Sequence, residues 1–67
     1  MLVKFFHNNT QLDQFKCSDI SGIIAAAKEA DNIAFENNCY KYESMTLKHY
    51  HKSGELCQEL IIYVKPS

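Results

Sequence analysis

The dipeptide Ser53-Gly54 separates two long runs of strand-forming residues, and this separation restricts the possible folds more than any other feature of the chain. A short polar loop with glycine between two such runs is typical of a β-hairpin. A loop with an even number of residues places Leu47 opposite Leu60. A three-residue loop would instead place Leu47 opposite Glu59 and mix the apolar and polar sides of the hairpin. We therefore predict a hairpin with an even loop.

The two sides of this predicted hairpin, residues 40–51 and 56–65, carry different side chains. In the even register the apolar side consists of Met45, Leu47, Leu56, Leu60, Ile62 and Val64. The opposite side consists of Thr46, Lys48, Tyr50, Cys57, Glu59, Ile61 and Tyr63. Successive side chains of a strand point to opposite faces. We therefore expect the first set to face a helix and the second to face outward, with Lys48 paired to Glu59.

The start of the first hairpin strand leaves the direction of two tyrosines open. The even register places Glu43 opposite Val64 and turns Tyr40 and Tyr42 outward. Tyrosines close to a tight turn also pack beneath neighbouring strands. A bulge or a strong bend near Glu43-Ser44 would give Tyr40 and Tyr42 that inward position.

Residues 18–31 are predicted to form an amphipathic helix. Ser18 is a favourable N-cap, and Asp19 follows it where the helix dipole stabilises an anion. The apolar positions with helical spacing are Ile20, Ile23, Ile24, Ala27 and Ala30. Gly22 inside the segment indicates either a close approach of the backbone or a tolerated loss of helix stability.

An N-terminal hairpin is expected before the helix. Residues 2–7 are rich in strand formers, and Asn8-Asn9 can supply the positive φ of a tight turn. A two-residue turn places Phe5 opposite Leu12 on a second strand over residues 10–16. The alternative for that segment is a helical turn capped by Thr10.

After the helix, Ile33-Ala34-Phe35 is a short strand candidate, followed by turn-forming residues at Glu36-Asn37-Asn38. The resulting element order is β-β-α-β-β-β. We predict a single α+β domain over residues 1–67, with an antiparallel sheet and one helix packed on one face. A chain of 67 residues is too short for more than one domain.

Charge and hydropathy restrict the partners of the chain. The formal net charge is −1, with interspersed signs, and every basic residue is lysine. The absence of arginine removes the planar group that reads guanine and clamps phosphate, which disfavours nucleic acid as a partner. The longest internal apolar run, residues 23–27, is far shorter than the roughly 20 residues of a membrane span. The N-terminus lacks the pattern of a secretory signal, so a cytoplasmic location is expected.

The possible metal ligands and reactive thiols form no recognisable motif. Cys17, Cys39 and Cys57 lack the spacing of a zinc site or a disulfide framework. His49 and His51 project from one strand face, while Cys57 points to the other. Cys17, just before the helix, is the best-placed reactive thiol, although a buried apolar role is more typical. No metal, cofactor or catalytic group is expected.

These observations favour a non-catalytic interaction module that self-associates or binds a larger protein through a tyrosine-bearing sheet face or a strand edge. The candidate interface consists of Tyr42, Thr46, Lys48, Tyr50, Ile61 and Tyr63. An ordinary half-exposed sheet surface is the plainest alternative. Two other functions stay open, which are single-stranded nucleic-acid binding by the same face and metal binding or thiol redox chemistry at His49, His51 or Cys17.

The second half of the chain, with the Asn37-Asn38 turn, Tyr40-Lys41-Tyr42 and the long amphipathic hairpin, is similar in general character to small proteins of bacteria and their phages. This resemblance implies no particular functional residue.

Overall fold

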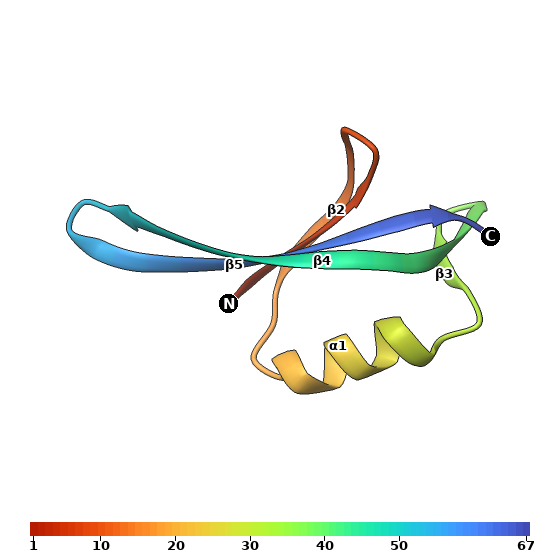
Figure 1. Cartoon of the computed structure of the whole chain (residues 1–67), viewed down its shortest axis with the longest axis horizontal. Coiled ribbons are helices and arrows are strands. Elements are labelled where there is room, and N and C mark those ends of the chain that lie inside the picture. Colours follow the sequence, from red (N-terminus) through yellow and green to blue (C-terminus); the bar gives the residue numbers. More distant parts are fainter.

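The computed structural model describes residues 1–67 as a five-stranded sheet with one helix on one face (Figure 1). The elements in chain order are β1 (Leu2–His7), β2 (Thr10–Lys16), α1 (Ile20–Glu29), β3 (Ile33–Phe35), β4 (Asn38–Lys52) and β5 (Glu55–Pro66). This is the predicted β-β-α-β-β-β order. The strands lie in the order β2-β1-β5-β4-β3, so the first and last strands of the chain lie side by side in the middle of the sheet.

The sheet is mixed, and the prediction of an antiparallel sheet was wrong for one of its four pairings. The pairs β1–β2, β3–β4 and β4–β5 are antiparallel, whereas β1 and β5 are parallel, with Val3 opposite Leu60 and Phe5 opposite Ile62. Each antiparallel pair is a hairpin, which leaves a local signal at its turn. The parallel pair joins strands at opposite ends of the chain, and no turn in the sequence marks it.

The β4–β5 hairpin has the predicted register. Its two-residue loop has φ of 52° at Ser53 and 79° at Gly54, as a type I′ turn requires, and Leu47 lies opposite Leu60. Of the bulge and the strong bend considered near Glu43-Ser44, the structure has the bulge, since the register shifts between Tyr42 and Ser44. Tyr42, rather than Glu43, therefore lies opposite Val64.

Residues 10–16 are the strand β2, which excludes the helical turn considered for that segment. The predicted pairing of Phe5 with Leu12 was wrong, because the register shifts between Phe5 and Phe6 and places Phe5 opposite Asp13. The shift leaves Leu12 as the extra residue of a bulge. Leu12 is half-buried against the core from this position.

The helix α1 is shorter than predicted at both ends. Its N-cap is Asp19 rather than Ser18, and the Asp19 side chain accepts a hydrogen bond from the Gly22 amide at 3.0 Å. A β-carbon at residue 22 would collide with the Asp19 carboxylate, so a larger residue at this position would require the capping side chain to move. The chain contains no helix with the length and apolar character needed to cross a bilayer.

The core is small and lies between α1 and the middle of the sheet. Its buried members are Val3, Phe5, Ala27, Leu60, Ile62 and Val64. The isoleucines of α1 and the aromatic residues Phe15, Phe35, Tyr40 and Tyr42 pack around it. The rings of Phe5 and Phe35 lie 5.2 Å apart, which joins β1 to the edge strand β3 across the core.

The predicted apolar side of the β4–β5 hairpin is only partly covered. Leu60 is 2% exposed, but Leu47 and Leu56 are 51% and 60% exposed. The reason is length, since the ten residues of α1 span about 15 Å and the fifteen residues of β4 span about 50 Å. The end of the hairpin, residues 47–56, extends beyond the helix as a two-stranded arm, here called the hairpin arm (Figure 1).

Replacement of two facing leucines tests this division of the hairpin. Leu60→Ala should lower the free energy of unfolding by about 2–4 kcal/mol, because it leaves a cavity in the core. Leu47→Ala should cost less than about 1 kcal/mol, because half of that side chain already contacts water. Urea denaturation measures both values. Equal losses would contradict the view that the helix covers only one end of the hairpin.

Candidate interaction face

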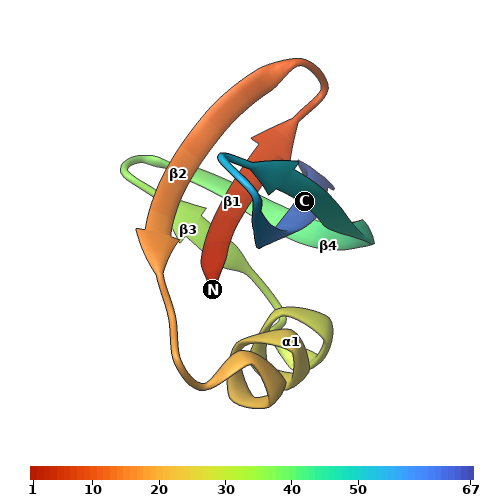
Figure 2. The ribbon, with the colours of Figure 1, turned by 90° about the vertical axis from the view of Figure 1, so that its left-hand side faces the viewer.

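The side of the sheet opposite α1 has no covering element, and its three central strands form what we call the open sheet face (Figure 2). The registers place Lys4 beside Ile61, and Ile61 beside Thr46, across β1, β5 and β4. The residues of this face on these strands are Leu2, Lys4, Phe6, Lys41, Ser44, Thr46, Lys48, Tyr50, Lys52, Glu55, Cys57, Glu59, Ile61, Tyr63 and Lys65. The aliphatic and aromatic side chains among them are half-buried by their neighbours rather than covered by another layer.

Five of the six residues predicted for an interface share this face. They are Thr46, Lys48, Tyr50, Ile61 and Tyr63. The sixth, Tyr42, lies on the helix side, because the bulge reverses the side-chain direction of the residues that precede it. Tyr42 packs against the core, and the ammonium of Lys28 on α1 lies 5.9 Å from the centre of its ring. Tyr42 therefore does not belong to the open sheet face.

Strand β1 contributes Leu2, Lys4 and Phe6, which the sequence reasoning missed. Phe6 lies opposite Tyr63, and their ring centroids are 6.4 Å apart. The alternation of Leu2, Lys4 and Phe6 with the buried Val3 and Phe5 is visible in the sequence. It does not reveal which strand lies beside β1, so the three residues were not assigned to this face.

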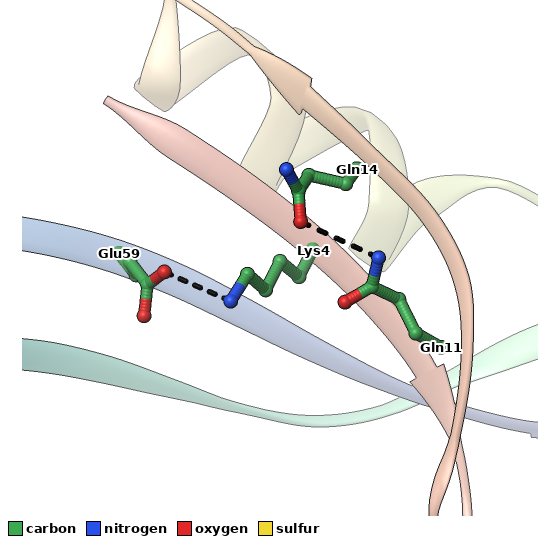
Figure 3. Close-up of polar contacts among 4 residues, drawn as sticks. All are labelled: Lys4, Gln11, Gln14 and Glu59. Atoms are coloured by element: carbon green, nitrogen blue, oxygen red, sulfur yellow. Dashed lines mark hydrogen bonds and ion pairs between the residues drawn. The ribbon is translucent and has the colours of Figure 1, made fainter.

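The centre of the open sheet face holds an ion pair. The Lys4 ammonium lies 2.9 Å from a carboxylate oxygen of Glu59, and the two side chains are 23% and 7% exposed (Figure 3). Glu59 had been expected to pair with Lys48, which does lie opposite it on β4. The ammonium of Lys48 instead lies 5.6 Å from the centre of the Tyr50 ring. The pair with Lys4 neutralises the only buried charge of the structure.

A second polar contact borders this ion pair on the side of β2. Gln14 lies opposite Lys4, and its side-chain oxygen accepts a hydrogen bond from the amide of Gln11 at 3.4 Å (Figure 3). The polar character of the face therefore increases toward β2. Its aromatic and aliphatic residues lie on β1, β5 and β4.

The surroundings of Tyr50 on the open sheet face change the pKa of its hydroxyl. Desolvation raises the pKa of the Tyr50 hydroxyl above its ordinary value, and the negative charge of Glu59 raises this pKa further. The positive charge of Lys4 acts in the opposite direction. Tyr50 therefore stays protonated at neutral pH and can donate a hydrogen bond to a partner.

The residues considered for metal binding do not come together. His49 and His51 lie on the helix side of the hairpin arm, where Nδ1 of His49 is 3.4 Å from the side-chain amide of Gln58. Cys57 lies on the open sheet face, on the opposite side of the same arm. The structure contains no group of three or more His, Cys, Asp or Glu side chains arranged to hold a metal ion.

Cys17 lies between β2 and α1, half-buried against the core, and its Sγ is 3.5 Å from the backbone oxygen of Asp19. This contact with a neutral carbonyl is the only hydrogen bond of the thiol. The arrangement corresponds to the packing role that was considered beside the reactive one.

The larger of two hollows in the surface, about 480 Å³, lies away from the open sheet face, between β2 and the turn that joins β3 to β4. Its lining includes the carboxylates of Asp13 and Glu36 and the rings of Phe35 and Tyr40. Asp13 already accepts a hydrogen bond from the backbone of Gln14 at 2.8 Å. None of the residues predicted for the interface lines this hollow.

Comparison of the chain with protein-family models, with curated proteins and with solved structures finds no match.

Substitutions of the two lysines that flank Glu59 test the ion pair. Lys4→Met should lower the free energy of unfolding by about 1–3 kcal/mol, because it leaves the Glu59 charge buried without a partner. Lys48→Met is the matched control and should cost less than about 0.5 kcal/mol, because Lys48 is exposed and makes no ion pair.

The single variant Glu59→Gln and the double variant Lys4→Met/Glu59→Gln complete a double-mutant cycle measured by urea denaturation, and the double variant is the decisive one. It should regain most of the stability lost in Lys4→Met. A larger loss for Lys48→Met than for Lys4→Met would contradict the observed pairing.

Proposed function

We propose that this chain is a non-catalytic protein-interaction module whose open sheet face binds another protein. One observation carries the proposal. A sheet buries its apolar side chains by packing each face against another layer, and here only one face has such a layer. The uncovered face carries aliphatic and aromatic side chains around a neutralised ion pair, which resembles the centre of a protein interface.

The chemistry of the face favours a partner with an apolar centre and hydrogen-bond acceptors at its border. Ile61 and the Phe6–Tyr63 pair supply apolar area, and the hydroxyls of Tyr50 and Tyr63 supply polar tips. The charge of Lys4 is cancelled by Glu59, whereas Lys41, Lys48, Lys52 and Lys65 lie on the same side of β4 and β5 without an ion pair. These lysines come without arginine, the planar group that clamps phosphate, in a chain of net charge −1, so a protein is favoured over a nucleic acid.

The location we propose is the cytoplasm. The chain holds three free cysteines, two of them half-buried and one exposed, and thiols in this state are typical of a reducing compartment.

Loss of the tyrosine rings tests the proposed face. The partner to be used is a protein that co-purifies with the chain in stoichiometric amount. The double variant Tyr50→Ser/Tyr63→Ser should lower the affinity for this partner at least tenfold, because aromatic residues at interfaces are frequent hot spots. The matched control is His49→Ser/Leu56→Ser, which changes the same two strands on their helix side and should leave affinity within about twofold. Isothermal titration calorimetry of the purified pair measures both.

Two outcomes would contradict the proposal. One is equal loss of affinity in the face variant and the control variant. The other is tight binding of single-stranded DNA or RNA that weakens steeply with salt and depends on Tyr50 and Tyr63, which would support the nucleic-acid alternative instead.

A further inference from the structure

Strand β4 has a long edge without a neighbour, which is separate from the open sheet face. On the side away from β5, β3 pairs only with Asn38–Tyr40 of β4. The rest of β4, residues 41–52, has no strand on that side. An unpaired edge of this length exposes a row of backbone donors and acceptors that a further strand can satisfy.

The turn of the hairpin determines which backbone groups are free. In a two-residue turn the flanking residues, Lys52 and Glu55, form a hydrogen-bonded pair, and such pairs alternate along an antiparallel ladder. The even-numbered residues from Ser44 to Lys52 therefore direct their N–H and C=O groups toward β5. The odd-numbered residues Met45, Leu47, His49 and His51 direct these groups toward the free edge.

We propose that the free edge of β4 pairs with the same edge of a second copy of the chain, antiparallel, with the two-fold axis at Leu47. In this arrangement Leu47 lies opposite Leu47 of the second copy, and Met45 lies opposite its His49. Both pairs use the free backbone groups, and their side chains lie on the helix side of both copies. Leu47, which is 51% exposed in the single chain, is then covered at the centre of the contact.

Repulsion between lysines and overlap with β3 favour this register over the two registers whose axes lie one residue away, at Lys48 and at Thr46. A shift that places the axis at Lys48 would set two lysine ammonium groups directly opposite each other. A shift that places the axis at Thr46 would bring Lys52 opposite Tyr40 of the second copy, where Ile33 of β3 already pairs. With the axis at Leu47, Lys52 lies opposite Tyr42, and the turn of each arm ends beside β3 of the other copy.

The pairing also supports the hairpin arm. A two-stranded hairpin is marginally stable by itself in water, and the arm has neither a helix nor a third strand beside it. In the proposed dimer each arm gains a third strand, and the two sheets join into one. The two-fold axis stands perpendicular to the sheet, so both open sheet faces lie on the same side and remain free. The inference thus goes beyond the proposed function and does not depend on it.

A cysteine at the axis tests the register directly. In a background of Cys17→Ala, Cys39→Ser and Cys57→Ser, the variant Leu47→Cys should form a disulfide-linked dimer on mild oxidation. The Cα atoms of a hydrogen-bonded pair lie about 5.5 Å apart, within the range of a disulfide. Leu56→Cys is the matched control, because Leu56 is similarly exposed on the same side of the arm but lies away from the axis.

Non-reducing electrophoresis should show the linked dimer for Leu47→Cys at least tenfold faster than for Leu56→Cys. Equal rates would overturn the proposed register, because they would indicate random collision.

The mass in solution provides the second measurement. Sedimentation equilibrium should show a dimer for the wild-type chain and for Leu56→Lys, and at least a tenfold weaker dimer for Leu47→Lys, with circular dichroism showing that all three are folded. A wild-type monomer at several hundred micromolar would overturn the inference. A dimer that survives Leu47→Lys but is lost in Tyr50→Ser/Tyr63→Ser would also overturn it, while supporting self-association through the open sheet face.

Discussion

The packing of β5 between β1 and β4 is the interaction on which the rest of the structure depends. Leu60, Ile62 and Val64 of β5 are among the six core residues, and each is at most 2% exposed. The parallel pairing with β1 brings Val3 and Phe5 beside them, under α1. The same pairing brings Lys4 to Glu59 on the other side of the sheet. Both faces of the sheet are thus organised around one strand.

The short helix then determines which surfaces stay available. One helix of ten residues covers the middle of one face. It leaves the opposite face open and leaves the hairpin arm without a covering layer (Figure 1). The short β3 has a similar effect on the edge of β4, since it occupies only the first three residues of that strand. The open sheet face and the free edge are therefore separate consequences of a long hairpin beside short partners, and the two proposed contacts can form together.

Much of this arrangement was predictable from local signals. Ser53-Gly54 and the alternation around it predicted the register of Leu47 with Leu60 and five residues of the open sheet face, and a bulge before Ser44 was one of two arrangements that would turn Tyr42 inward. The parallel pair of β1 and β5 was not predictable in this way, because it joins distant segments without a shared turn. Because this pairing was not predicted, Lys4 and Phe6 were not expected on the open sheet face. The exposure of Leu47 and Leu56 was missed for another reason, since the pattern of a strand shows which residues share a side but not how far a helix reaches along it.

Residue-resolved amide hydrogen exchange along β4, followed by NMR at low and high protein concentration, tests the account most directly. At low concentration the amides of Thr46, Lys48 and Tyr50 should exchange slowly, because they bond to β5, and those of Leu47 and His49 should exchange fast. At high concentration the amides of Leu47 and His49 should become protected as the second copy covers the edge. Fast exchange of all five amides at both concentrations would contradict the paired arm, and unprotected Leu47 and His49 amides in a concentrated sample would contradict the covered edge.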